Sequence, residues 1–401
     1  MRLLRDRKPR LQLGFLIFTT SVILSGCSSC NNIVERRDVR PLIMRDVPAQ
    51  RLAFRLEADT GLPADVKVDD ANDKLPEIQN DFNTRRKDEA LLRTVKSPDG
   101  QRALALYGTA DDPTEVFRID LYSADGKFLR NLTPPELAGA FPETAAWSPD
   151  GNFITFIAHR SSQPSPSPTP LDEAPVVPSA SPDASAQPSA APSVAPVFAP
   201  VAVFNTEQIY ICNRDGYELH PLTTREGLIY FYFSWAPDNH ALAALACKED
   251  EWNARERDAK LPAGRPRLLT PEGTERLLDD QITEALPVWS PDASKVATAF
   301  DTDVGIYDAA TSKPTQGRVP LREPLLAASR TYEQKTSGNA SPASATDEAP
   351  PSFNPIVRLA WPTPEHLYLK TAYVRLLQSE TINTFQRWHE LVLSPQAAIL
   401  K

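Results

Sequence analysis

The side chains that most often carry catalysis lie far apart in this sequence. The chain has 401 residues and five histidines, spread one to a region. They are His159, His220, His240, His366 and His389. No nucleophile elbow of the form Gly-x-Ser-x-Gly, phosphate loop, dinucleotide fingerprint or His-Glu-x-x-His pair occurs. We therefore predict no catalytic residue, no cofactor-binding residue and no metal ligand, and a protein that is not an enzyme.

Two acidic stretches could still contribute to binding. Asp301 and Asp303 flank Thr302 and could offer oxygen ligands to a cation, but the rest of a calcium loop is missing. The run Glu249–Glu251, followed by Trp252, could form a contact patch. Because charge runs are usually solvated, we interpret the first stretch as a turn and the second as an exposed loop.

Covalent chemistry is predicted at one position, Cys27. A basic stretch from Arg2 to Arg10 precedes an apolar run, 11–24, which ends in Leu24-Ser25-Gly26-Cys27. The apolar run has the length of a signal peptide and is short for a membrane span. The last four residues are typical of a bacterial lipobox, where cleavage before the cysteine is followed by its lipidation. A plain secretory signal or an uncleaved anchor is the alternative, although neither needs Cys27.

The lipobox sets the predicted location of the protein. We expect a signal peptide over residues 1–26, lipid on Cys27 and a tether over residues 27–50 that holds the protein on a membrane. By resemblance to lipoproteins of bacteria with two membranes, Ser28 implies the periplasmic side of the outer membrane. The formal net charge of −9 argues against a nucleic-acid partner.

The remaining cysteines have two interpretations. Cys30 lies on the predicted tether, whereas Cys212 and Cys247 each lie in an apolar, strand-like run. An oxidising compartment permits a disulfide between the last two. Buried free cysteines are common, so we favour two unpaired core thiols.

Any site must be positioned by the strands of a repeated unit. Its clearest copy is the segment 147–151, Trp-Ser-Pro-Asp-Gly, followed by an apolar strand over 152–158. Pro149 presets φ at the second position of a type I turn, Asp150 favours the turn, and Gly151 can adopt a positive φ. Related turns recur at 97–100, 236–239 and 290–293, and in degenerate form at 361–365. In these copies Lys96 replaces the aromatic residue, and Asn239 and Ala293 replace the glycine.

The spacing of the turns indicates a regular repeat. Ser97 and Ser148 lie 51 residues apart, and Trp235 and Trp289 lie 54 apart. The two longer intervals contain inserts, 161–200 and 336–352, whose Pro, Ser and Ala composition predicts disorder. Without the inserts the period is about 50 residues, that of a four-stranded propeller blade. A linker between two domains is the alternative for 161–200, but the strands missing from the interrupted unit resume at Gln208.

The repeats resemble those of TolB-type β-propellers. The resemblance covers residues 93–401 and is best in the second unit, where 147–151 is followed by Ile209-Tyr210, Asp215-Gly216 and Leu222-Thr223. It implies an all-β propeller of four-stranded blades over residues 51–401, carried on a lipoprotein. Five blades are recognisable. Because the family usually has six, residues 45–92 would supply either the sixth blade or a closing strand.

The repeated motif is interpreted as structural. Its aromatic residues would pack between adjacent sheets, and its aspartates would cap turns. The positions concerned are Trp147, Pro149, Asp150, Gly151, Trp235, Asp238, Trp289, Asp292 and Trp361. The motif therefore identifies a scaffold without identifying its ligand.

The combined prediction is a lipid-anchored envelope protein that binds another envelope protein. TolB-type proteins act in envelope complexes with partners such as peptidoglycan-associated lipoproteins, and only that class of partner is implied. The alternative is a propeller that binds or cleaves a glycan at its central channel, as lyases with similar blades do. Cleavage would need converging His, Arg or Glu side chains and a metal.

Overall fold

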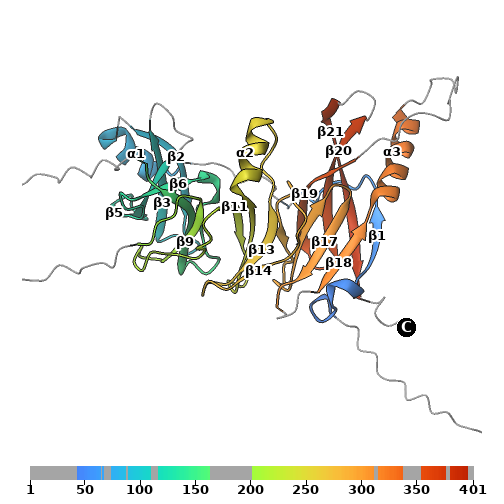
Figure 1. Ribbon diagram of the computed structural model, residues 1–401, viewed down its shortest axis with the longest axis horizontal. Helices are drawn as coiled ribbons and strands as arrows, with labels where there is room; N and C mark the ends of the chain where they lie inside the picture. The colour runs from blue at the N-terminus through green and yellow to red at the C-terminus, as the bar shows by residue number, and fades with distance from the viewer. Residues whose placement is uncertain are drawn as a thin grey trace, which may run out of the picture. The chain divides into compact units, whose positions relative to one another are not determined.

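The computed structural model describes residues 43–64, 66, 74–86, 89–109, 116–162, 201–310, 315–336, 354–375 and 380–395. The predicted signal peptide, Cys27, Cys30 and nearly all of both predicted inserts lie outside these residues. Within them, the regular structure is mostly antiparallel β-sheet, with three α-helices (Figure 1). No helix in the described ranges is both long enough and apolar enough to cross a lipid bilayer.

Five successive units of four antiparallel strands can be followed along the chain. The first has β2 (Glu89–Lys96), β3 (Arg102–Thr109), β4 (Phe117–Ser123) and β5 (Phe128–Asn131). The second has β7 (Ala146–Trp147), β8 (Phe153–Arg160), β9 (Gln208–Asn213) and β10 (His220–Pro221). The third has β11 (Leu228–Trp235), β12 (Leu242–Lys248), β13 (Arg265–Leu269) and β14 (Glu275–Leu277). The fourth has β15 (Val288–Trp289), β16 (Lys295–Phe300), β17 (Asp303–Asp308) and β18 (Gln316–Pro320).

The fifth unit is completed by the N-terminal strand. It has β19 (Ile356–Thr363), β20 (His366–Arg375) and β21 (Glu380–Ser394), and β1 (Ala53–Glu57) pairs with β21 in antiparallel register (Figure 1). Of the two roles predicted for residues 45–92, the structure thus gives a closing strand. A further strand, β6 (Leu137–Ala140), pairs with both β4 and β8 and joins the first two units in one sheet.

The predicted tether is shorter than the sequence indicated. Two 3-10 turns, η1 (Met44–Asp46) and η2 (Ala49–Arg51), precede β1. Met44 and Ala49 belong to a core cluster with residues of the fourth and fifth units, and the Ala49 N–H donates to Asp308 Oδ2 at 3.0 Å. Burial of these apolar side chains therefore draws residues 44–50 into the fold.

One turn joins the first two strands in the first four units. The N–H groups of Gly100, Gly151, Asn239 and Ala293 each donate to the carbonyl three residues earlier, at 2.8–3.0 Å. All four residues have positive φ, at 68°, 72°, 66° and 57° in that order. Asn239 and Ala293 therefore adopt the left-handed conformation that glycine takes in the other copies.

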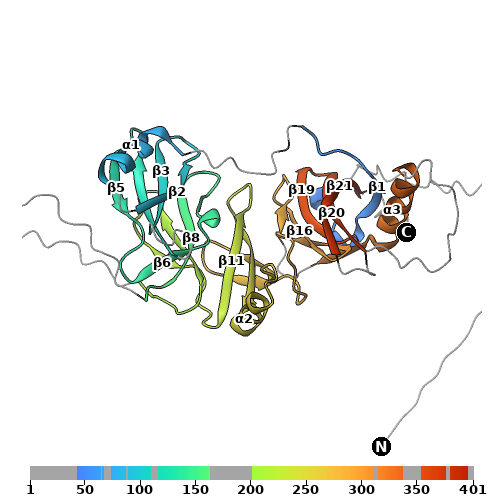
Figure 2. The same ribbon diagram turned by 90° about the horizontal axis from the view of Figure 1, so that it is seen from above.

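Three local features differ from the predicted ones. The acidic run forms the start of a helix, α2 (Glu249–Arg257), rather than a loop, because Trp252 packs on Phe231 and Phe141. Figure 2 shows this helix beside β11. The apolar run 267–270, which the sequence indicated as the last strand of the third unit, is its third strand, β13, and β14 closes the unit. A helix that was not predicted, α3 (Arg322–Thr336), follows β18.

Candidate functional site

The motif tryptophans link successive units. Trp147 Nε1 donates to the Val95 carbonyl and Trp289 Nε1 to the Ser234 carbonyl, each at 3.1 Å. Trp235 Nε1 donates to Thr155 Oγ1 at 2.9 Å. Each acceptor lies in the unit before its tryptophan. Trp361 differs, because its Nε1 donates to Pro364 within its own turn.

The motif aspartates are engaged in their own turns. Asp150 Oδ1 accepts hydrogen bonds from Ser148 Oγ and from the Asn152 N–H, and Asp292 Oδ1 accepts the equivalent pair. Asp238 accepts from the His240 N–H at 3.2 Å. Partial burial opposes ionisation of Asp150, but these hydrogen bonds outweigh it and lower the pKa of its carboxyl group. Pro149 and Gly151 complete the turn, and Gly151 lies beside Pro98 of the first unit. Hydrogen bonds thus engage the motif aspartates within their own turns.

The described cysteines are free and buried, as predicted for two core thiols. Burial raises the pKa of both Cys212 and Cys247 to about 12. Because the thiolate is the reactive form, neither side chain is prepared for nucleophilic chemistry at neutral pH.

The histidines remain separate in the fold. His389 is buried, its Nδ1 accepts the Asp59 N–H at 3.2 Å, and its Nε2 lies 3.0 Å from Thr371 Oγ1. Burial lowers the pKa of His389 to about 4, so it is neutral at physiological pH. His159 Nδ1 lies 3.8 Å from a Glu207 carboxylate oxygen. His220 contacts the Glu218 carbonyl, His240 contacts Asp238, and His366 contacts Glu390.

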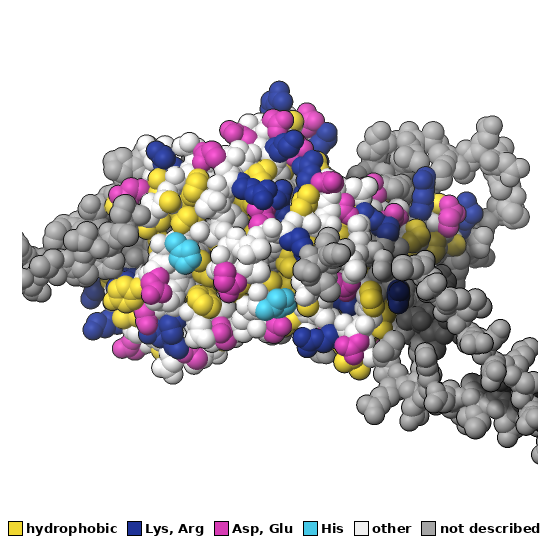
Figure 3. Space-filling view, turned by 60° about the horizontal axis from the view of Figure 1, so that its bottom comes forward, with side chains coloured by type: hydrophobic (Ala, Val, Ile, Leu, Met, Phe, Trp, Pro, Cys, Tyr) yellow, Lys and Arg dark blue, Asp and Glu magenta, His cyan; other side chains and the backbone are white. Residues whose placement is uncertain are grey.

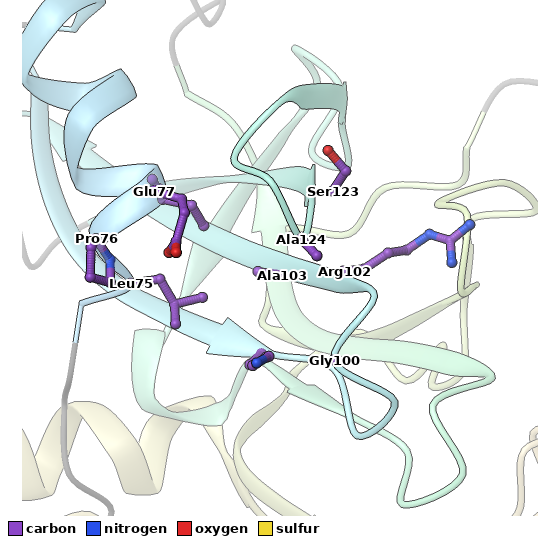
Figure 4. Close-up of a pocket in the computed structure, with 10 residues that line it drawn as sticks. Leu75, Pro76, Glu77, Gly100, Arg102, Ala103, Ser123 and Ala124 are labelled. Atoms are coloured by element: carbon purple, nitrogen blue, oxygen red, sulfur yellow. The ribbon is translucent and has the colours of Figure 1, made fainter.

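A small pocket lies between the start of α1 (Pro76–Arg85) and the first unit (Figure 4). Its volume is about 180 Å³, and its wall includes Glu77, Lys96 and Arg102. Figure 4 shows Arg102 extending away from the start of α1, and this guanidinium pairs with Asp215 of the second unit. A cavity of this size holds a few water molecules and offers a ligand little surface.

A larger hollow, here called the Asp301 hollow, lies at the turn between β16 and β17. Its volume is about 590 Å³. Nine residues line it: Arg265, Asp280, Gln281, Ile282, Phe300, Asp301, Thr302, Asp303 and Arg322. They come from the start of β13, the segment after β14, the β16–β17 turn and the first residue of α3. Residues 301–303, which the sequence suggested as possible oxygen ligands for a cation, thus form part of the lining of a polar hollow.

Backbone hydrogen bonds hold the β16–β17 turn in place. The Asp301 carbonyl accepts the Ile356 N–H at 2.6 Å, and the Thr302 carbonyl accepts the Leu321 N–H at 3.2 Å. Asp301 itself has a φ of +52°. The segments leading into α3 and into β19 therefore both fix this turn, so the carboxylates beside it are carried on a rigid frame.

Several polar groups of the hollow have no partner among the described residues. The carboxylates of Asp301 and Asp303 and the guanidinium of Arg322 make no hydrogen bond or ion pair with residues of the described ranges. Thr302 is only 7% exposed, and its hydroxyl also makes no hydrogen bond there. Arg265 is different, because Glu251 holds its guanidinium through two hydrogen bonds of 2.7 and 2.9 Å.

The hollow has neither a metal-ligand set nor a histidine. Within the described ranges, no three His, Cys, Asp or Glu side chains gather as ligands for a metal ion. On the face drawn in Figure 3, acidic, basic and apolar side chains are interspersed. The arrangement at Asp301 can therefore bind through charge and hydrogen bonds.

Sequence reasoning found part of this site. It singled out residues 301–303, but it missed Asp280 and Arg322. In an antiparallel meander, the turn between strands two and three and the connection to the next unit lie at the same end of the sheet. The strand order of the third and fourth units could therefore have predicted that Asp280 and Arg322 lie near residues 301–303.

Comparisons with known proteins are distant. No protein-family model and no curated protein matches the chain. Among solved structures, it is similar to an oligogalacturonate lyase from Vibrio parahaemolyticus, with 9% identity, a TM-score of 0.36 and coverage of 76% of this chain and 66% of the lyase. It is also similar to a TolB protein from Agrobacterium tumefaciens, with 11% identity, a TM-score of 0.29 and coverage of 76% and 89%.

A prolyl endopeptidase gives a similar result. The identity is 10%, the TM-score is 0.35, and the match covers 75% of this chain and 36% of the endopeptidase. The chain therefore spans less than two thirds of both the lyase and the endopeptidase. At these identities and TM-scores, the similarities carry no argument about activity, substrate or partner.

Proposed function

We propose that the chain is a non-enzymatic β-propeller scaffold of the cell envelope, lipid-anchored at Cys27, that binds another envelope protein at the Asp301 hollow. The propeller arrangement is supported by five consecutive four-stranded units that share one turn and by the N-terminal strand in the last sheet. The lipid anchor is supported by the lipobox, and the envelope location and outer-membrane attachment follow from that proposal.

The observation that carries the binding proposal is the set of unpartnered side chains at the hollow. Elsewhere, the motif carboxylates accept hydrogen bonds in their own turns, the described thiols are buried and four of the five histidines are hydrogen-bonded. The described residues give Asp301, Asp303 and Arg322 no such partner. Charged groups held rigidly at an open hollow, without internal partners, are suited to recognition of an external ligand.

A glycan ligand is the second candidate, and the hollow favours it less. Glycan sites commonly present an aromatic face to the sugar ring. Phe300 is the aromatic residue of the hollow, but it is 9% exposed, and the Arg318 guanidinium lies 4.4 Å from its ring centroid. The ring is therefore largely covered, so a protein partner is the better match.

Photocrosslinking in the envelope tests the binding proposal. A photoreactive phenylalanine analogue is placed at Ile282, which lines the hollow and is 39% exposed, or at Phe153, which is 36% exposed and follows a motif turn. We expect a discrete adduct with an envelope protein from Ile282 and none from Phe153. No adduct at Ile282, or the same adduct at both positions, would contradict the proposal.

The anchor has its own test. A Cys27→Ser variant is compared with the unchanged protein by metabolic labelling with a clickable fatty acid and by membrane fractionation. We expect the label and the membrane association to be lost together, because acyl chains supply the anchoring energy. Membrane association that persists in the unlabelled variant would exclude Cys27 as the anchor.

A further inference from the structure

The unpartnered charges of the Asp301 hollow are mainly negative. Among the described residues, the two carboxylates of Asp301 and Asp303 have no partner, and neither does the single guanidinium of Arg322. Asp280 adds a third carboxylate to the lining. The other cation, Arg265, is already neutralised by Glu251. This imbalance makes the hollow attractive to a positive charge.

The polar atoms of this wall are suited to a ligand that donates hydrogen bonds. Ionised carboxylates only accept hydrogen bonds, and a threonine hydroxyl has two acceptor lone pairs. The Thr302 hydroxyl lines the hollow without a partner although the residue is 7% exposed. This hydroxyl keeps some accessible surface, so a ligand that donates to it adds a hydrogen bond that the described residues do not supply. Ammonium and guanidinium groups donate several hydrogen bonds and accept none.

The rim of the hollow can hold the aliphatic part of such a ligand. Ile282 is 39% exposed and lines the hollow beside Asp280 and Gln281. Lysine and arginine bury their methylene stems along apolar surface while their charged ends bind polar groups. The volume of about 590 Å³ exceeds what one such side-chain end requires.

We propose that the Asp301 hollow recognises a lysine or arginine side chain in a basic segment of the partner protein. This inference rests on the proposed function and specifies the chemistry of its binding site. Asp301, Asp303 and Thr302 accept hydrogen bonds from the cation, and Ile282 contacts its stem. Arg322 disfavours the cation and sets a limit on how many basic residues can enter.

Binding of a labelled hexalysine peptide tests the proposal. Its affinity for the purified protein is measured by fluorescence anisotropy at about 0.15 M salt, where distant surface charges are screened. We expect binding that weakens at least tenfold in the Asp301→Asn/Asp303→Asn variant and is unchanged or tighter in Arg322→Gln. A labelled hexaglutamate peptide should not bind. Asp280→Asn, which removes the third carboxylate of the lining, should weaken hexalysine binding by a smaller factor.

The control removes the same charge elsewhere. Glu249→Gln/Asp250→Asn takes two carboxylates from the exposed start of α2 and should leave hexalysine binding unchanged. Equal weakening in this control would mean nonspecific attraction and would overturn the proposal. Three other results would also overturn the proposal. They are the absence of hexalysine binding, unchanged hexalysine binding in the Asp301→Asn/Asp303→Asn variant, and hexaglutamate binding that is lost in Arg322→Gln.

The two proposals can fail independently. A partner crosslinked at Ile282 together with absent hexalysine binding would leave the scaffold function in place and refute the cationic ligand. Specific hexalysine binding without a crosslinked partner would support the cation-binding hollow and refute the binding of an envelope protein there. Urea unfolding midpoints equal to that of the unchanged protein establish that the isosteric variants are folded.

Discussion

The indole Nε1 of Trp289 donates a hydrogen bond to the backbone carbonyl of Ser234, 3.1 Å away in the preceding unit. Ser234 directly precedes Trp235, the equivalent aromatic residue of that unit. Trp147 makes the same contact with Val95, the residue before Lys96. In the second and fourth units, the motif tryptophan thus bonds to the backbone of the preceding unit, whereas Trp235 bonds to the Thr155 hydroxyl of the unit before it.

Replacing Trp289 with phenylalanine should weaken the contact between the third and fourth units. The aromatic ring remains, but the Ser234 carbonyl loses its indole donor, at a cost of about 1–2 kcal/mol. Hydrogen exchange should accelerate in both β11 and β15. Trp361→Phe is the matched control, because its lost bond lies within one turn, and it should alter exchange in the fifth unit only. Faster exchange confined to β15 in Trp289→Phe would contradict this role.

Substitutions at two equivalent positions of the motif turn, Gly151 and Ala293, should affect stability differently. Gly151→Ala should destabilise the protein by about 1–2 kcal/mol, because alanine is strained at a φ of 72°. Ala293→Gly should change stability by less than about 0.5 kcal/mol. There, relief of strain at a φ of 57° is offset by loss of a buried methyl group, worth about 0.8 kcal/mol. Urea unfolding measures both. A large stabilisation by Ala293→Gly would show that the methyl group contributes nothing.

Acid should destabilise the protein through His389. Its pKa is about 4 in the folded protein, below its ordinary value of 6.5, so the unfolded chain binds the proton more readily. The stability due to neutral His389 is complete above pH 6.5 and is lost as the pH falls towards 4. Between pH 7 and pH 4.5 we expect a loss of about 2 kcal/mol.

A His389→Gln variant isolates this effect from carboxylate titration. Its stability at pH 7 should be lower, because the contacts with Asp59 and Thr371 are disturbed. Its further loss between pH 7 and pH 4.5 should be smaller than that of the unchanged protein. Parallel pH profiles of unfolding free energy for the two proteins would exclude His389 as the titrating group.

The buried ion pair between Lys295 and Asp308 should contribute to attachment of the N-terminal segment. Lys295 Nζ donates to Asp308 Oδ1 at 2.8 Å, while Asp308 Oδ2 accepts the Ala49 N–H. Lys295→Met leaves a buried carboxylate without its cation, which should cost about 3 kcal/mol. Proteolysis should then become faster at residues 43–52. Lys260→Met, at an exposed ion pair, should leave both measurements unchanged.

The sequence predicted the repeated units because their information is local. A Pro-Asp turn followed by an apolar strand can be recognised within about ten residues, and the turn chemistry at Asp150 acts within that range. For residues 45–92, local information left two possible roles, a sixth blade or a closing strand. The strand character of β1 lies in residues 53–57, but its pairing with residues 390–394 depends on contacts more than 300 positions away.

The hollow could be predicted only in part, because it is formed by strand ends that are distant in sequence. Asp301 and Asp303 could be recognised in the sequence as an acidic turn. Asp280 and Arg322 join them only because the fold places their segments at the same end of the sheet. The start of the fold at Met44 was missed because the buried apolar residues Met44, Val47 and Ala49 follow neither a helix period nor a strand period. Their burial depends on the fourth unit, which lies more than 230 residues later.

Crosslinking from Ile282 in the Asp301→Asn/Asp303→Asn background tests the account most directly. It combines the proposed partner, the proposed hollow and the proposed charge in one measurement in the intact envelope. We predict that the adduct seen with the unchanged hollow falls at least tenfold in this background and persists in Glu249→Gln/Asp250→Asn. An adduct of equal yield in all three proteins would contradict the claim that these carboxylates recognise the partner.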